Sequence, residues 1–195
     1  MSPVFATGLT EPLKLNEMKE SAIAIRRVNG EEDLWYAERL YLSSFPEDER
    51  REVSDWIAYT WSKPEFCNSI IECAGRKVGF ISFWDFDDFV YVEHFATDAA
   101  VRGKGLGGMA VETLCRTAGK PVVLEVELPV DDISRRRIAF YERHGFKLCG
   151  RKYVQPPYRA GGNELEMKIM WINAVDIEGV FNDIVARIYN KVYGV

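Results

Sequence analysis

The chain has 195 residues, 47% of them hydrophobic, and a formal net charge of −5 at pH 7. This is enough apolar material for one full hydrophobic core, so we expect a single domain. The negative net charge argues against non-specific electrostatic binding of nucleic acid, which requires a basic face. We therefore expect no nucleic-acid partner.

Cysteine spacing and hydropathy indicate whether the protein binds a metal or crosses a membrane. The four cysteines, Cys67, Cys73, Cys115 and Cys149, show no CxxC or Cys/His ligand spacing, which predicts reduced core thiols and no metal site. The N-terminus lacks a basic region followed by an apolar run, and no later run approaches the roughly 18 apolar residues that cross a membrane. These patterns predict a cytoplasmic protein without membrane contact.

Residues 1–21 have no sustained periodicity, and we expect an N-terminal tail without an assigned function. A strand is predicted from residue 23, followed by helices at 31–44 and 50–61. Three aromatic-rich runs then follow, separated by short turns. They predict an antiparallel meander at 66–74, 77–86 and 89–97.

The order then changes to alternating helices and strands. Helices at 105–118 and 133–144 alternate with strands at 121–127 and 147–154, which implies locally parallel pairing. A last strand is expected at 165–171.

The final predicted segment is an amphipathic helix at 175–193. Its apolar stripe, which runs from Ile177 to Val192, is wider than a solvent-facing helix carries. We thus predict a main domain at 22–172 and a C-terminal helix within 173–195, packed on that domain or on a homodimer partner.

A glycine-rich run joins the strand at 89–97 to the helix at 105–118. First-turn amides of a helix have no intrahelical partner and lie at the positive end of the helix dipole, so they form an anion site. Glycines there lack the Cβ atoms that would hold a phosphate off the backbone, and two cations lie beside them. The residues are Arg102, Gly103, Lys104, Gly105, Leu106, Gly107 and Gly108.

This chemistry fits a pyrophosphate, although a loop that only needs positive φ angles is the alternative. Two better-known glycine motifs do not fit. The glycines at 103, 105 and 108 satisfy GxGxxG, but they follow antiparallel strands instead of opening a βαβ unit. The Walker pattern requires Gly-Lys-Ser/Thr, which is missing here.

Three motifs in this order resemble the signature of the GNAT superfamily of acyl-CoA-dependent N-acetyltransferases: Phe95-Ala96-Thr97, Arg102-x-x-Gly105-x-Gly107 and Tyr141-x-x-x-Gly145-Phe146. The resemblance spans about residues 23 to 171. It implies an α/β (α+β) fold with a mixed, mostly antiparallel sheet of six to seven strands flanked by helices. The fourth and fifth strands would splay apart around the pantetheine arm of the co-substrate.

The resemblance implies acetyl-CoA as co-substrate and no metal. The residues that it places at the co-substrate are Phe95, Ala96, Thr97, Arg102, Gly103, Lys104, Gly105, Leu106, Gly107, Gly108, Ser134 and Arg137. Three of them depart from the family pattern. Ser134 stands where many members have Asn, Arg137 where a small residue is usual, and Thr97 where an aliphatic residue is common.

Tyr141 is the candidate acid. Helical geometry at about 100° per residue places Tyr141 and Ser134 within about 20° on one face, flanked by Arg137. The resemblance implies that Tyr141 hydrogen bonds to the thioester sulfur and protonates the departing thiolate. The alternative is an amphipathic core tyrosine.

Glu93 is the candidate base. A period of two places it on one strand face with Tyr91, Phe95 and Thr97, unless a bulge intervenes. In a partly apolar site its pKa would be raised, and it would take a proton from the substrate ammonium directly or through water. His94 and an ordinary surface role for Glu93 are the alternatives.

The next strand carries Glu125 and Glu127, which face one way. They lie either in the acceptor groove, where they would attract a cationic amine, or on a solvated sheet face. Of the basic triplet at 135–137, only Arg137 shares the face of Tyr141.

The resemblance implies direct attack of a primary amine, from a small molecule or peptide, on acetyl-CoA without an acyl-enzyme intermediate. It also implies that the segments 44–52 and 154–162 determine which acceptor is bound. The alternative is a CoA-binding regulatory module without catalysis.

Overall fold

An eight-stranded sheet organises residues 22–174 and 177–195, the part of the chain that the computed structural model describes. Its strand order is β1-β2-β3-β4-β5-β8-β6, and β7 also pairs with β8. The β4–β5 pair is parallel and the other pairs are antiparallel. The mixed, mostly antiparallel sheet is thereby confirmed, while the predicted tail at 1–21 lies outside the described residues.

The strands follow the predicted runs closely, with one exception. They are β1 (Ile23–Arg27), β2 (Phe66–Cys73), β3 (Arg76–Asp85), β4 (Val90–Thr97), β5 (Val122–Glu127), β6 (Lys147–Leu148), β7 (Tyr153–Gln155) and β8 (Leu165–Ile172).

The exception is the strand predicted at 147–154, which is two strands, β6 and β7. Leu148 pairs with Met170 and Tyr153 with Met167. The chain therefore advances five residues while its partner β8 advances three, and the two extra residues loop out of the ladder.

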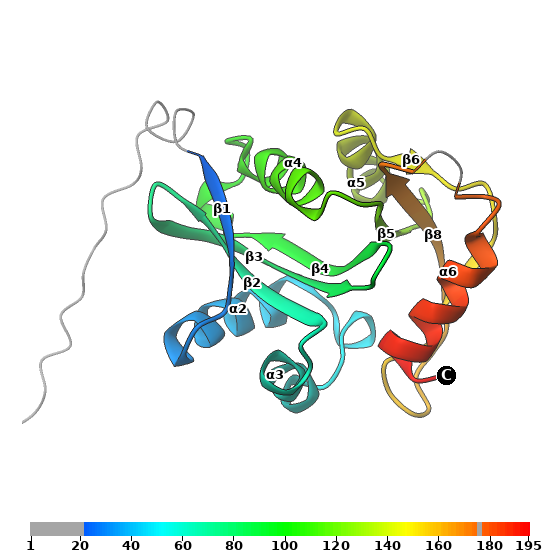
Figure 1. The fold of residues 1–195 in the computed structure, drawn as a ribbon, viewed down its shortest axis with the longest axis horizontal. Coiled ribbons are helices and arrows are strands. Elements are labelled where there is room, and N and C mark those ends of the chain that lie inside the picture. Colours follow the sequence, from blue (N-terminus) through cyan, green and yellow to red (C-terminus); the bar gives the residue numbers. More distant parts are fainter. Residues whose placement is uncertain (1–21, 175–176) are drawn as a thin grey trace, which may run out of the picture.

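Helices cover both faces of the sheet. They are α2 (Glu31–Ser44), α3 (Val53–Ser62), α4 (Leu106–Ala118), α5 (Asp132–Arg143) and α6 (Phe181–Ile188), with short helical turns η1 (Glu47–Glu49), η2 (Ala99–Val101) and η3 (Tyr189–Tyr193). Helices α2 and α3 lie on one face and α4 on the other (Figure 1). No helix within residues 22–174 and 177–195 has the length and apolar character needed to cross a membrane.

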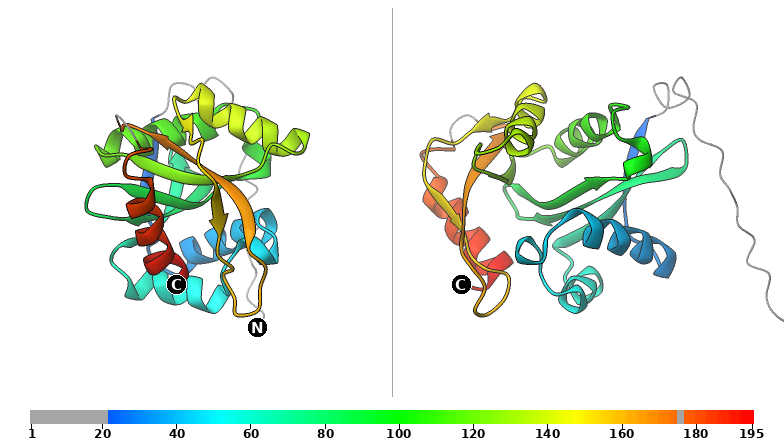
Figure 2. Two further views of the ribbon diagram at one scale, coloured as in Figure 1. Left: turned by 90° about the vertical axis from the view of Figure 1, so that its right-hand side faces the viewer. Right: turned by 180° about the vertical axis from the view of Figure 1, so that it is seen from behind.

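The C-terminal helix packs against its own chain. Seen from behind, it lies beside the half of the sheet that holds β7 and β8 (Figure 2). Its apolar side chains are buried in one core with residues of β3, β5 and β8; they are Phe181, Ile184, Ile188 and Val192. The helix begins at Phe181, later than predicted, and residues 175–176 lie outside the described part.

Strands β4 and β5 stay together for three residue pairs only. The pairs are Val90–Val122, Tyr91–Val123 and Val92–Leu124, and beyond them β4 remains paired with β3 but not with β5. The predicted splaying of the two strands is therefore present. The backbone edge of β4 after Val92 faces the gap instead of a neighbouring strand.

A β-bulge in β4 corrects the expected arrangement of side chains. Ser82 pairs with His94 and Phe83 with Val92, so Glu93 is the extra residue. The bulge shifts the alternation by one, and Phe95 packs in the same core as Val92 on the α4 side. The expectation that Glu93 shares a face with Phe95 and Thr97 is therefore wrong.

Candidate active site

A cavity of about 540 Å³ lies where β4 and β5 part. Four elements supply its walls: the end of α2, the open parts of β4 and β5, and one side of α5. Its lining includes Phe45, Glu93, Phe95, Ala96, Thr97, Arg102, Glu125, Arg136, Arg137 and Tyr141. The structure thus brings seven of the fourteen predicted site residues together around one space.

A smaller hollow of about 290 Å³ shares Thr97, Arg102 and Phe140 with this cavity. It is lined mainly by the glycine-rich run, namely Gly103, Gly105, Leu106, Gly107 and Gly108. Lys104 lines neither space. The predicted anion loop and the β4–β5 gap therefore form one continuous candidate site.

Gly105 positions the free amides of the loop. It caps α4 with a φ of +82°, in the left-handed region that favours glycine. The amide of Met109 donates to the carbonyl of Gly105 at 3.2 Å, so the amides of residues 106–108 have no partner inside the helix. The side chain of Leu106 is buried in the core, so this residue offers only its backbone.

Gly108 has a packing role in addition to its place at the hollow. A Cβ atom at this position would lie 2.4 and 2.5 Å from ring atoms of His144. The His144 Nδ1 atom is in turn 2.9 Å from a carboxylate oxygen of Glu112. The missing Cβ therefore lets the turn after α5 close against α4.

Ser134 is turned away from the site. Its hydroxyl accepts from the amide of Asp131 at 3.2 Å, and its own amide donates to the Asp131 carboxylate at 2.7 Å, which closes a capping box on α5. Ser134 is 4% exposed and lines neither space. The structure thus contradicts the predicted contact of this side chain with the co-substrate.

Two arginines of α5 line the cavity. Arg137 forms an ion pair with Glu127. Arg136 lines the cavity as well, although by helical geometry it does not share the face of Tyr141. Among the described residues Arg136 has no ion-pair partner.

Tyr141 lies at the cavity wall with 8% of its surface exposed. Its hydroxyl makes no hydrogen bond to any residue in the described part of the chain. Burial raises the pKa of Tyr141 to about 12, although the nearby Arg137 acts in the opposite direction. The phenol therefore keeps its proton at neutral pH and is able to donate it.

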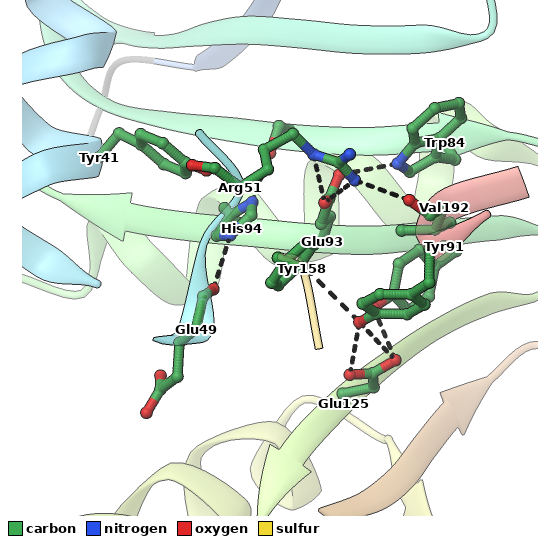
Figure 3. A network of polar contacts seen from close by, with 12 residues as sticks. Tyr41, Glu49, Arg51, Trp84, Tyr91, Glu93, His94, Glu125, Tyr158 and Val192 are labelled. Atoms are coloured by element: carbon green, nitrogen blue, oxygen red, sulfur yellow. Dashed lines mark hydrogen bonds and ion pairs between the residues drawn. The ribbon is translucent and has the colours of Figure 1, made fainter. Parts of the chain in front are cut away.

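Glu93 differs from its predicted state (Figure 3). The Arg51 Nη2 atom lies 2.5 Å from one Glu93 carboxylate oxygen, and the indole of Trp84 donates to the other at 2.7 Å. The Glu93 side chain has no exposed surface. Burial alone would raise its pKa, but Arg51 outweighs burial and lowers it. The expected raised pKa of Glu93 is therefore wrong.

His94, the alternative base, is also enclosed. It is 2% exposed and lies 3.3 Å from the Ser82 hydroxyl and 3.2 Å from the carbonyl of Glu49. Burial lowers the pKa of His94 to about 4. The imidazole is therefore neutral at physiological pH, and it does not line the cavity.

Glu125 has the properties that were expected of Glu93. It is half-buried, lines the cavity, and accepts hydrogen bonds from Tyr91, Tyr153 and Tyr193. Figure 3 labels Glu125 and Tyr91. Burial raises the pKa of Glu125 to about 7, against the lowering effect of the three hydroxyls. A carboxylate that titrates near neutral pH is suited to accept a proton there.

The two segments expected at the acceptor are joined by Arg159. Its guanidinium forms ion pairs with Glu47 and Glu52, which connects the loop after β7 to the segment between α2 and α3. Phe45 lines the cavity, and the ring centre of Tyr158, in the loop after β7, lies 5.1 Å from the guanidinium carbon of Arg51. Trp56 is fully buried in the core.

The fold and this cavity can now be compared with known proteins. Residues 32–146 match the model of the Acetyltransferase (GNAT) family. The chain belongs to this family. Acetyl-CoA-dependent N-acetyl transfer is general among GNAT members. The matched range ends before β6, so Tyr153 and Tyr193 lie outside it.

Individual relatives agree with the GNAT assignment. A solved structure named "Putative acetyltransferase from GNAT family" from Bacteroides thetaiotaomicron is 41% identical, with a TM-score of 0.84 over 88% of this chain and 99% of that one. "Putative acetyltransferase YjbC" of Bacillus subtilis (strain 168) is 39% identical over 70 residues, which are 34% of this chain and only 35% of that protein.

A more distant structure, yncA, a putative acetyltransferase from Salmonella typhimurium with its cofactor acetyl-CoA, is 21% identical, with a TM-score of 0.55 over 80% of this chain and 99% of that one. At this identity the likeness concerns the fold.

Proposed function

We propose that this chain transfers the acetyl group of acetyl-CoA to a primary amine of a small molecule or peptide by direct attack, without an acyl-enzyme intermediate. One observation carries the proposal. The cavity at the β4–β5 split joins the glycine-rich loop to a titratable carboxylate, Glu125, and to a protonated phenol, Tyr141.

The donor side fits an acyl-CoA. The free amides of residues 106–108 and the cations Arg102 and Arg136 suit a pyrophosphate. The unpaired edge of β4 from Glu93 to Thr97 offers backbone groups to the amides of a pantetheine arm. When bound, acetyl-CoA supplies the activated thioester. A fold neighbour from Salmonella typhimurium is described with acetyl-CoA as its cofactor.

Glu125 and Tyr141 divide the proton transfers. Glu125 removes a proton from the acceptor ammonium, which makes the nitrogen lone pair available. The new bond joins this nitrogen to the acetyl carbon, and the carbon–sulfur bond breaks. Tyr141 gives its proton to the departing thiolate, and the second proton that the nitrogen loses returns to Tyr141 through water. Glu125 takes the role first expected of Glu93, whose buried carboxylate instead holds Arg51.

A thiol-release assay tests this function. Acetyl-CoA is offered with polyamines, amino acids, aminoglycosides and N-terminal peptides. We expect release with at least one class, and a loss of kcat of about 10²-fold or more in Glu125→Gln and Tyr141→Phe. Tyr36→Phe is the matched control, because the Tyr36 hydroxyl is buried without a partner in the described structure.

Two outcomes would contradict the proposal. Full turnover by Tyr141→Phe would remove the acid assignment. Calorimetric binding of CoA without thiol release for any amine would instead favour the regulatory module.

A further inference from the structure

The carboxylate of Glu125 is surrounded by tyrosine hydroxyls from distant parts of the chain. Tyr91 comes from β4, Tyr153 from β7 and Tyr193 from η3, the last helical turn. The Tyr91 hydroxyl lies 2.7 Å from Oε1 of Glu125, and the Tyr193 hydroxyl lies 3.1 Å from Oε2 and 3.3 Å from Oε1. Tyr153 donates to Oε1 as well.

All three phenols are donors at neutral pH. Burial raises the pKa of Tyr91, Tyr153 and Tyr193 above the ordinary tyrosine value, so each keeps its proton. Neutral donors stabilise a carboxylate less than a guanidinium does. Glu125 is therefore held in place without the strong ion pair that locks Glu93.

Other charged and titratable groups near Glu125 act more weakly. The Glu93 carboxylate on β4 opposes ionisation of Glu125, and it is itself paired with Arg51. The hydroxyl of Tyr158, in the loop after β7, lies 3.5 Å from the hydroxyl of Tyr193. Tyr158 therefore contacts Glu125 only indirectly, through Tyr193.

Tyr193 is the member of this cluster that contacts both carboxylate oxygens. Its helical turn is fixed in place, because the carbonyl of Val192 accepts from Arg51 at 3.1 Å and Tyr189 donates to the carbonyl of Val154. The C-terminal segment thus contacts the Glu125 carboxylate through one hydroxyl, although it lies outside the range that matches the family model.

We propose that Tyr193, with Tyr91 and Tyr153, is a positioning residue that orients the Glu125 carboxylate toward the cavity and favours its ionised form. The role of Glu125 as base rests on the proposed function above, but the positioning by Tyr193 is a property of the protein alone. The C-terminal segment then contributes to the site through Tyr193, in addition to packing against the hydrophobic core.

The test uses the full-length protein labelled with ¹³C at glutamate side-chain carboxyl carbons. The signal of Glu125 is identified by its absence in Glu125→Gln, and its titration is followed by NMR without substrates. We expect a midpoint near pH 7 in the native protein. In Tyr193→Phe the midpoint rises by about one pH unit, because a hydrogen bond to the charged form is lost.

Tyr36→Phe is the matched control. It removes a buried tyrosine hydroxyl that has no hydrogen-bond partner in the described structure, so the midpoint of Glu125 should stay unchanged. Tyr153→Phe should shift the midpoint upward, as Tyr193→Phe does. An unchanged or lowered midpoint in Tyr193→Phe, with the protein still folded by circular dichroism, overturns the inference.

Kinetics separate this inference from the proposed function. If acetyl transfer is found, the acid limb of the pH profile of kcat/KM should shift to higher pH in Tyr193→Phe, by the same amount as the NMR midpoint. A shifted midpoint with no activity toward any amine would uphold the positioning and reject the function. A shifted midpoint with an unmoved acid limb would show that Glu125 is not the base.

Discussion

Glu93 and Glu125 are the first residues of β4 and β5 beyond the last backbone pair, Val92–Leu124, and the protein shifts their pKa values in opposite directions. Glu93 faces a guanidinium, whereas Glu125 faces only neutral hydroxyls. Two neighbouring carboxylates thereby acquire different tasks: one remains ionised, and the other titrates near neutral pH.

The raised pKa of Glu125 predicts a pH-dependent cost to stability. The folded state binds this proton more tightly than the unfolded state, whose pKa is near the ordinary 4.5. The resulting stability is present below pH 4.5 and is lost as pH rises through about 7. Glu125→Gln should therefore have a higher Tm than the native protein at pH 8, with the difference shrinking at pH 5. A lower Tm at pH 8 would contradict a raised pKa.

Removal of Arg51 should destabilise the protein strongly. Arg51→Met leaves the Glu93 carboxylate buried without its cation, which costs about 3–5 kcal/mol in the free energy of unfolding. Urea unfolding at pH 7 measures the loss. Arg50→Met is the control, because it removes a hydrogen bond to the carbonyl of Phe45 and a contact with the Tyr41 ring but no buried ion pair.

The same pair has a pH signature. The lowered pKa of Glu93 means that the pair stabilises the protein above the unfolded pKa of about 4.5, and that this stability is lost as pH falls through the folded value. The difference between Arg51→Met and the native protein should narrow under acid conditions. A constant difference would mean that Arg51 acts by packing alone.

Gly108→Ala should destabilise the junction of α4 with the turn after α5. The new Cβ would lie 2.4 Å from the ring of His144, and such overpacking costs about 1–3 kcal/mol. Adding His144→Ala should restore most of the loss. Gly107→Ala is the control in thermal unfolding, because its Cβ would meet neighbours only at 3.6 Å or more. Failure of the double variant to recover would place the effect elsewhere.

Arg136→Ala should weaken donor binding. Arg136 lines the cavity that adjoins the hollow of the glycine-rich loop, and loss of one phosphate contact should raise KM for acetyl-CoA about three- to tenfold, more at low salt. Arg135→Ala is the control, since Arg135 bonds to Asp132 and the carbonyl of Pro129. Equal effects of the two variants would indicate general surface charge.

The sequence predicted most of the fold because local patterns determine most of it. Aromatic-rich apolar runs separated by short turns identified the meander at 66–97, and the helical periods at 106–118 and 132–143 were equally clear. Two misses, the bulge at Glu93 and the division of 147–154 into β6 and β7, depend on register with a partner strand. No pattern within a single strand contains that information.

The sequence likewise predicted some parts of the site and missed others. Motif spacing found the loop at 102–108 and Tyr141, because both depend on neighbouring residues. The environment of Glu93 depends on Arg51, which lies 42 residues away in the sequence. The environment of Glu125 depends on Tyr153 and Tyr193, which lie 28 and 68 residues away. A strand with alternating glutamates signalled Glu125 as a candidate, but its pKa follows from the assembled core.

The parting of β4 and β5 has a further consequence. Unpaired strand edges ordinarily lie at the rim of a sheet, where another chain can pair with them and cause aggregation. Here the open edge after Val92 lies in the middle of the sheet, beside a cavity of about 540 Å³. A narrow molecule with its own amides can reach these groups, whereas a full β-strand from another protein meets α5 and the end of α2 first.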